Sequence, residues 1–282
     1  MLRILDARTG EPVPAAPARR GLTRIEAHAS GLDPTALRVL LTADLLVRAL
    51  EVGGTPVWTA LSAPRHQAEL RTAATRLAIR PFEDGRDLAS GLGEAQAIHV
   101  MCPDVTSTPG EGPLVSVGGA EWTPGPENAG NTENVENAEN AENADGGTKG
   151  WPTGGPSGSG APGPLGTLLA DPAALRLALL AVPRGEPVRL DRAALDAAAD
   201  RLARWRRAVA GWARRPSRPV PGEVRERLRA AWEDDLDLPA VLDVLAEVAN
   251  ASGIPDGARF ETYAYADRLL ALDLTRDIGG PA

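Results

Sequence analysis

The chain has 282 residues, a net charge of −8 from 30 basic and 38 acidic residues, and 43% apolar residues, enough for one large domain or two ordinary ones. No apolar run approaches the 18 or so residues of a membrane span, which argues against a membrane protein. The single cysteine, Cys102, excludes an internal disulfide framework and a multi-cysteine metal centre. Because the first residues, Met-Leu-Arg, lack an apolar signal segment, we expect a cytoplasmic protein.

Residues 1–122 alternate between predicted strands and helices. Short apolar runs flanked by Gly or Pro predict strands over 2–5, 22–27, 55–61 and 98–102. Asp33-Pro34 supplies an N-cap and a proline at the first helical position, which predicts a helix from there to residue 51. Ser62-Ala63-Pro64 predicts a second helix to residue 77, capped by Ser62. Strand–helix–strand order indicates an α/β domain with a parallel sheet and right-handed crossovers.

Residues 123–164 have the composition of a linker. Asn recurs with a period of three from 128 to 143, mostly after Glu, and a Gly/Pro/Ser tract follows from 146 to 164. Lys149, the single lysine of the chain, is the one basic residue of the segment. With almost no apolar side chains, this segment is predicted to be a flexible acidic tether.

Residues 165–282 are predicted to be helical. Asp171-Pro172 begins a helix to residue 180, and further helices are expected over 221–232, 239–251 and 258–272. Asp191 caps a long helix whose apolar stripe keeps three-and-four spacing: Leu195, Ala198, Leu202, Trp205, Val209 and Trp212. Short connections predict antiparallel neighbours and therefore a small helical bundle.

Parts of the chain resemble a known family. The strand over 25–28, the next helix with Arg38, Asp44 and Arg48, and the strand beginning Gly53-Gly54-Thr55-Pro56-Val57 are similar to the start of class I cysteinyl-tRNA synthetases and of the cysteine ligase of mycothiol biosynthesis. Residues 171–180, 203–209 and 233–239 resemble segments of the same proteins further along. The resemblance covers roughly residues 1–100 and 165–250. It implies a truncated class I synthetase-like (Rossmann-like, HUP-type) parallel-sheet domain, followed by a small helical bundle.

Both ATP signatures of that family are missing. Aligned on Asp44, the family's His-Ile-Gly-His falls on Asp33, Pro34, Thr35 and Ala36, so both imidazoles are absent and a carboxylate stands where phosphate would approach. The family's Lys-Met-Ser-Lys-Ser should precede Leu165, where residues 157–163 carry no charge. If any nucleotide pocket remains, the resemblance places it at Ser30, Asp33, Thr35 and Arg38.

The zinc ligands of the family are missing as well. The resemblance implies a cysteine ligand after the strand over 25–28, where this chain has Ala29 or Ser30. Together His28, His66, His99 and Cys102 could supply a site, and His28 and His99 could both end neighbouring strands, but their spacing is not that of ligands. We therefore expect no metal site.

One basic patch stands out. Residues 201–218 hold seven arginines and no acid. The exposed members could dock RNA or the chain's own acidic linker, and the residues that we expect to do so are Arg204, Arg207, Arg214 and Arg215. A tRNA partner is less favoured than a solvated helix face or docking of the linker, because the chain is acidic overall.

These features predict a degenerate paralogue that has lost adenylation, with no catalytic residue and no cofactor, and that binds or regulates an unknown protein or small molecule. One alternative is an ATP-dependent ligase of the aminoacyl-tRNA synthetase type with a remodelled nucleotide pocket. Another is an RNA-binding accessory protein.

Overall fold

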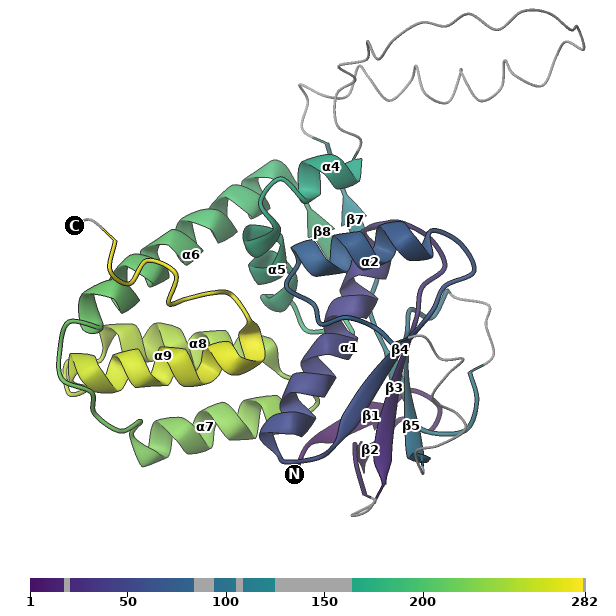
Figure 1. Ribbon diagram of the computed structural model, residues 1–282, viewed down its shortest axis with the longest axis horizontal. Helices are drawn as coiled ribbons and strands as arrows, with labels where there is room; N and C mark the ends of the chain where they lie inside the picture. Colours follow the sequence, from purple (N-terminus) through teal and green to yellow (C-terminus); the bar gives the residue numbers. More distant parts are fainter. Residues whose placement is uncertain (18–20, 84–93, 105–108, 125–163, 281–282) are drawn as a thin grey trace, which may run out of the picture.

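The computed structural model describes residues 1–17, 21–83, 94–104, 109–124 and 164–280 (Figure 1). Its central sheet has four parallel strands in the order β4-β3-β5-β6. The strands are β3 (Leu22–His28), β4 (Val57–Ser62), β5 (Glu94–Met101) and β6 (Leu114–Ser116). The predicted α/β fold class and three of its strands are confirmed, whereas the three-residue β6 was not predicted.

Helix α1 (Pro34–Val52) packs its leucines on one face of this sheet. Leu37, Leu41 and Leu46 are at most 2% exposed and lie in one core with Ile25 and Ile98 of the strands. The helix begins as predicted, because the Asp33 side chain accepts a hydrogen bond from the Ala36 N–H and Pro34 occupies the first position.

Helix α2 (Gln67–Arg76) begins four residues later than the sequence predicts. Ser62 does not cap it, because Ser62 is the last residue of β4 and pairs there with His28 of β3. His66 precedes α2 in the left-handed region, at φ 56°, and makes no capping hydrogen bond with its side chain. Strand pairing has overridden the local Ser-Ala-Pro signal.

The sheet has the topology of half of a doubly wound fold. After α2 the chain reaches the outer edge of β4, where Glu83 forms a parallel bridge with Ala60 and its N–H donates to the Thr59 carbonyl at 2.8 Å. The chain then returns to the other side of β3 as β5. The direction of strand succession therefore reverses between β3 and β5, the position at which open α/β sheets bind ligands.

The N-terminal strand does not join the parallel sheet. Strand β1 (Arg3–Asp6) pairs antiparallel with β2 (Glu11–Pro14) in a separate hairpin. Asp6 attaches the hairpin to β6, since its carboxylate accepts the Leu114 N–H at 3.0 Å. The predicted strand over 2–5 therefore exists, outside the main sheet.

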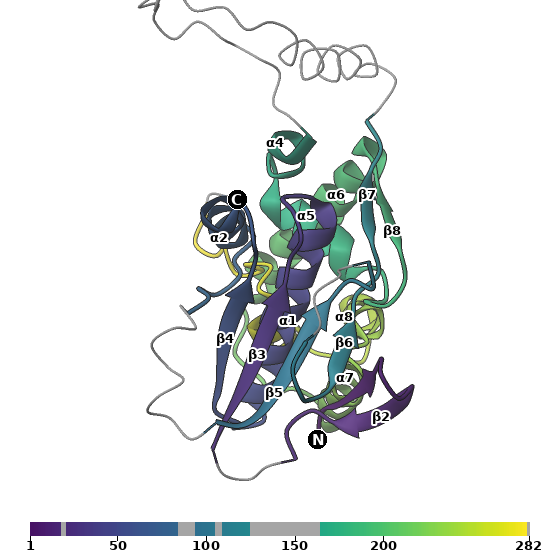
Figure 2. The ribbon, with the colours of Figure 1, turned by 90° about the vertical axis from the view of Figure 1, so that its right-hand side faces the viewer.

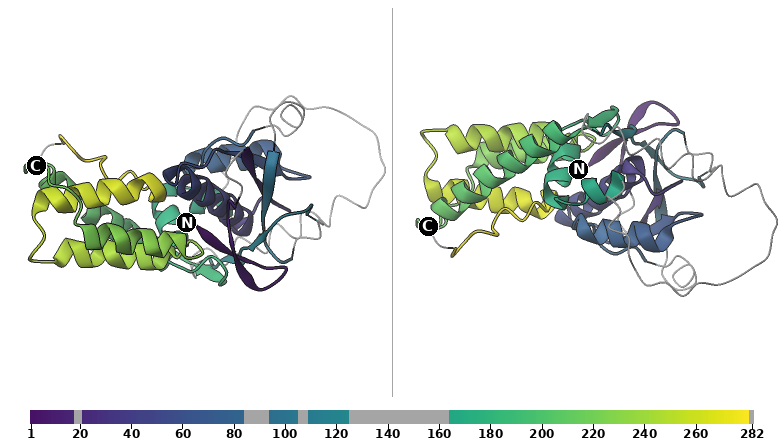
Figure 3. Two further views of the ribbon diagram at one scale, coloured as in Figure 1. Left: turned by 90° about the horizontal axis from the view of Figure 1, so that it is seen from below. Right: turned by 90° about the horizontal axis from the view of Figure 1, so that it is seen from above.

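The helical part extends from one end of the α/β part (Figure 3). Its helices are α4 (Pro164–Leu168), α5 (Pro172–Leu180), α6 (Arg192–Trp212), α7 (Gly222–Glu233), α8 (Leu238–Asn250) and α9 (Asp256–Leu270). Asp171 and Asp191 cap α5 and α6 as predicted, and the predicted stripe of α6 is buried. Within the described ranges, no helix combines the length and apolar character that crossing a bilayer requires.

The two parts share one hydrophobic core and one small sheet. Strand β7 (Ala120–Trp122) pairs in parallel with β8 (Val188–Leu190), which precedes α6. Arg176 of α5 and Asp44 of α1 form an ion pair across the same boundary. The division at residues 122 and 165 stays a prediction, and most of the predicted tether, residues 125–163, lies outside the described residues.

Candidate functional site

The first turn of α1 is closed by its own cap. The Asp33 carboxylate accepts the Ala36 N–H at 2.8 Å, and the Asp33 carbonyl accepts the Leu37 N–H at 3.2 Å. Pro34 has no N–H to offer. Phosphate binding at a helix N-terminus relies on free N–H groups and on the positive end of the helix dipole. The Leu37 bond is the first ordinary bond of the helix, whereas the Asp33 carboxylate takes up the Ala36 N–H, one of the free groups, and adds a negative charge, so the turn is built as a capped helix end.

Thr35 and Ser30, two further residues of the predicted nucleotide pocket, differ in their surroundings. The Thr35 hydroxyl accepts the Ala120 N–H at 2.9 Å and lies 3.2 Å from the Ala120 carbonyl, to which it donates. Ser30, two residues beyond the end of β3, is exposed. Thr35 therefore attaches β7 to α1, and Ser30 is the member of the predicted set whose side chain faces solvent.

Arg38, the cation of the predicted set, is 2% exposed and bound to backbone carbonyls. Its guanidinium donates to carbonyls of two segments that lie far away in the sequence: Gly118 (3.0 Å), Gly119 (3.4 Å), Val182 (3.3 Å), Pro183 (2.8 Å) and Glu186. Burial lowers the pKa of Arg38 to about 10, so it stays protonated at neutral pH. Arg38 thus joins the segment before β7 to the loop before β8.

The zinc site implied by the resemblance does not fit the residues present. At the end of β3, Ala29 is buried and Ser30 is exposed, and neither offers a thiolate or an imidazole. Cys102 is buried at the end of β5, with its Sγ 3.8 Å from a carboxylate oxygen of Asp104. A cysteine-ligated zinc of the family type therefore has no ligand set in the described residues.

A different group of side chains meets between β3 and β5. Ile25 and Ala27 face α1, so the intervening Glu26 and the following His28 lie on the opposite face of the sheet, which is toward the viewer in Figure 2. His99 of β5 is the direct cross-strand partner of Glu26. His28 Nε2 lies 3.1 Å from His99 Nδ1, and Glu26 oxygens lie 3.6 Å from His99 Nδ1 and 4.0 Å from His28 Nε2.

The hydrogen bonds assign the protons of the two imidazoles. His99 Nε2 lies 3.2 Å from the Glu111 carbonyl, which can only accept, so His99 carries its proton there and its Nδ1 has a free lone pair. His28 Nε2 donates to that lone pair. His28 Nδ1 is buried and has no hydrogen-bond partner among the described residues.

Burial sets the charge of this cluster. His28 and His99 are 6% and 1% exposed, and desolvation lowers the pKa of both below the usual histidine value, against the opposing effect of the Glu26 carboxylate. Both rings are therefore neutral at pH 7. Within the described ranges, these three residues are a group of His and acidic side chains whose ligand atoms all lie within 4.8 Å of one another.

Sequence reasoning identified two of the three members. The prediction that His28 and His99 end neighbouring strands is close to what is observed, since β3 and β5 are adjacent. Glu26 was not singled out. The period-two alternation of a strand could have found it, because Glu26 and His28 are two residues apart and so share a face.

The predicted arginine patch divides into half-buried and exposed members. Arg201 stacks on Trp205, 4.5 Å from the ring centroid, and Arg206 donates to the Leu272 carbonyl at 2.6 Å. The members proposed for docking are exposed: Arg204, Arg207, Arg214 and Arg215. What they bind stays a prediction.

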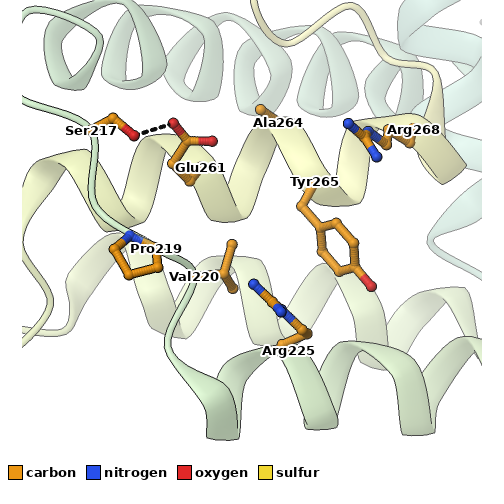
Figure 4. Close-up of a pocket in the computed structure, with 8 residues that line it drawn as sticks. All are labelled: Ser217, Pro219, Val220, Arg225, Glu261, Ala264, Tyr265 and Arg268. Atoms are coloured by element: carbon orange, nitrogen blue, oxygen red, sulfur yellow. Dashed lines mark hydrogen bonds between the residues drawn. The ribbon is translucent and has the colours of Figure 1, made fainter.

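A groove of about 500 Å³ lies beside this patch, between α7 and α9 (Figure 4). Ser217 donates to Glu261 at 2.6 Å on one side of it. Arg225, with its guanidinium carbon 5.9 Å from the Tyr265 ring centroid, lines the other side with Arg268. Cations beside an aromatic ring suit an anionic ligand, and no sequence pattern drew attention to this groove.

Three curated proteins are similar to part of this chain, and all are named L-cysteine:1D-myo-inositol 2-amino-2-deoxy-alpha-D-glucopyranoside ligase. The protein of Parafrankia sp. is 43% identical over 114 residues, which covers 37% of this chain and 25% of that protein. Those of Streptomyces griseus and Streptosporangium roseum are 41% identical over 108 and 109 residues, again covering 37% of this chain and 25% and 26% of theirs.

No protein-family model matches the chain. The chain spans about a quarter of the length of the curated relatives that it matches. Over that part, the resemblance to the mycothiol cysteine ligase, a protein related to class I cysteinyl-tRNA synthetases, is confirmed.

Proposed function

We propose that this chain is a cysteine-ligase-like protein that binds a small molecule or a protein partner and does not adenylate an amino acid. The observation that carries the proposal is the first turn of α1, where the Asp33 carboxylate caps the Ala36 N–H and places a negative charge at the start of the helix. In the related enzymes, the resemblance implies that this turn meets the phosphates of ATP.

The absence of the signature imidazoles and lysines is expected to raise the free-energy barrier to adenylation. Adenylation develops negative charge on the α-phosphate and on the departing pyrophosphate, and loss of one donor aimed at such charge costs roughly 3 kcal/mol. Asp33 and Ala36 stand at the positions of the two signature imidazoles, and the chain has no lysine besides Lys149. Even with strong overlap between these losses, the rate is expected to fall by many orders of magnitude.

Arg38 is poorly suited to replace them. It is the cation nearest to the start of α1 in the sequence, but its guanidinium is buried and already donates to five carbonyls. Turning it toward a phosphate would leave those buried carbonyls without a donor, at about 1–3 kcal/mol for each carbonyl left unsatisfied.

Titration calorimetry with ATP and Mg²⁺, in the presence and absence of cysteine, tests the proposal. We expect no saturable binding at the start of α1. Micromolar binding that Ser30→Ala and Thr35→Val both weaken would instead support the remodelled pocket of an ATP-dependent ligase. Arg225→Gln and Arg268→Gln serve as matched controls, because they remove cations from the groove between α7 and α9 and leave α1 intact.

RNA binding is a second candidate, favoured by the four exposed arginines Arg204, Arg207, Arg214 and Arg215. If it operates, RNA affinity falls steeply with salt and drops in a variant with all four changed to Gln. An affinity unchanged by those substitutions would remove this candidate.

A further inference from the structure

The cluster of Glu26, His28 and His99 lies where the strand order of the sheet reverses. His28 is the last residue of β3, and His99 lies in the adjacent β5, so the cluster sits between the two strands that flank the reversal. Ligands of open α/β sheets bind at the carboxyl ends of strands at such a reversal. The start of α1 borders the same end of β3, but the cluster uses none of its residues.

The spacing of the ligand atoms suits a metal ion. An ion held by imidazole and carboxylate ligands at about 2.0–2.1 Å in tetrahedral geometry keeps its ligand atoms roughly 3.3 Å apart. The three separations here are 3.1, 3.6 and 4.0 Å. Two imidazoles and one carboxylate are a ligand set that Zn²⁺ and similar divalent ions prefer, and it leaves a coordination position open.

We propose that Glu26, His28 and His99 form a binding site for one divalent transition-metal ion of the Zn²⁺ type, with its open position available to water or to a small anionic ligand. This site goes beyond the proposed function. It also differs from the cysteine-ligated zinc that the resemblance implies, because its ligands come from within β3 and β5 and include no sulfur.

The surroundings of His99 support this assignment. Its Nε2–H donates to the Glu111 carbonyl, which directs the Nδ1 lone pair toward His28 and Glu26. A hydrogen bond of this kind to the distal nitrogen orients most metal-binding histidines. Arg8 donates to the Pro109 and Gly110 carbonyls and so holds the segment that carries Glu111 over His99.

His28 supplies the second imidazole. It is 6% exposed, its Nε2 points into the cluster, and its Nδ1 has no hydrogen-bond partner among the described residues. An ion at Nε2 requires the neutral ring to hold its proton on Nδ1, so metal binding changes the tautomer that donates to His99 in the metal-free protein.

The charge of Arg24 lowers the affinity of the cluster for a metal ion. Arg24 Nη2 lies 3.8 Å from a carboxylate oxygen of Glu26, and its positive charge weakens the attraction of the cluster for a cation. The proposal therefore predicts that substitutions at different positions change the metal affinity in opposite directions. Removing Glu26 or His99 weakens binding, and removing the charge of Arg24 strengthens it.

Co²⁺ titration of the tag-free, chelator-treated full chain tests the site, with the visible absorption of bound Co²⁺ as the readout. We expect one Co²⁺ per chain, displaced by Zn²⁺, and a loss of affinity of about 100-fold in His99→Gln and about 10-fold in Glu26→Gln. Arg24→Gln is expected to raise the affinity severalfold. His66→Gln and Cys102→Ser are the controls, and both are expected to leave binding unchanged.

Three outcomes would overturn the site: no Co²⁺ absorption in wild type at millimolar Co²⁺, equal affinity in wild type and His99→Gln, or loss of binding in His66→Gln. Glu26→Gln keeps the test decisive if His99→Gln fails to fold, because Glu26 is partly exposed and Gln has the same shape. The melting temperature of wild type should also rise with added Zn²⁺, and that of Glu26→Gln should rise less at the same Zn²⁺ concentration. ATP takes no part in this test, so its failure and that of the proposed function are distinguishable.

Discussion

Asp44 of α1 and Arg176 of α5 form a buried ion pair at 2.9 Å, although they are 132 residues apart in the sequence. The Asp44 and Arg176 side chains are 0% and 1% exposed. Arg176 also donates to the Leu77 and Leu270 carbonyls at 2.7 and 2.6 Å. One guanidinium thus connects α1, the end of α2 and the end of α9, which explains why the two parts of the chain share a core.

Asp44→Asn is expected to destabilise the protein by about 3–5 kcal/mol, because it removes the carboxylate that pairs directly with the buried guanidinium of Arg176. Urea unfolding at pH 7 measures the loss. Asp196→Asn is the matched control, since Asp196 pairs with Arg192 at 3.0 Å on the surface of α6 and is expected to contribute less than about 1 kcal/mol. Equal effects of the two substitutions would contradict the assignment of the buried pair.

Arg38→Met is expected to lower the free energy of unfolding by about 3 kcal/mol, since it leaves several buried carbonyls without a donor. Arg204→Met, at an exposed position of α6, is expected to change it by less than about 0.5 kcal/mol. Thermal melts of both variants show whether Arg38 has a structural role, which lowers the melting temperature of Arg38→Met alone, or is held for ligand binding. An unchanged melting temperature in Arg38→Met would refute the structural role.

Alanine substitutions at Gly118 and Gly119 provide a further test with a matched control. A Cβ on Gly118 would lie 2.2 Å from the Glu186 carbonyl oxygen, whereas a Cβ on Gly119 would meet its nearest atom, Thr35 Oγ1, at 3.9 Å. Gly118→Ala is therefore expected to destabilise by about 1–3 kcal/mol and Gly119→Ala by much less. Similar unfolding free energies for the two variants would show that the backbones at residues 118 and 186 do not pack as closely as observed.

The metal-free protein is expected to lose stability as the pH falls. Burial lowers the pKa of His28 and His99 in the folded state, so below about pH 6.5 the unfolded chain binds more protons than the folded one. Their contribution is fully present above pH 6.5 and is lost as the pH falls toward the folded-state pKa values. Urea unfolding from pH 7.5 to 5 in a chelator measures the slope.

A His28→Gln/His99→Gln variant should flatten that slope, and His66→Gln, at an exposed position, should leave it unchanged. A slope that persists in the double variant would assign the pH dependence to other groups.

The helix starts were predictable because their signals are local. Asp33-Pro34 and Asp171-Pro172 each combine an N-cap carboxylate with a proline in the first turn, and both begin helices as expected. Ser62-Ala63-Pro64 offers a similar local pattern, but Ser62 gains a strand partner in His28, and the helix begins later. A single sequence does not show which of the two competing interactions prevails.

The candidate sites depend on longer-range contacts. The carbonyls that bind Arg38 lie 80 to 148 residues away from it, and His28 and His99 are 71 residues apart. No spacing rule connects such positions. Sequence reasoning could therefore predict that the ATP signatures are replaced, but it could not show that Arg38 and Thr35 bind backbone groups of β7 and of the segment before it.

The exchange of labelled pyrophosphate into ATP, with cysteine and then with other amino acids, tests the central claim most directly, because it reports adenylation without requiring the second substrate. The account predicts that exchange with the wild-type chain equals the rate without protein, and that Asp33→Asn, which keeps a helix cap and removes the charge, does not restore it. Robust amino-acid-dependent exchange in wild type, lost in Thr35→Val, would contradict the account and establish an adenylating enzyme with a rebuilt pocket.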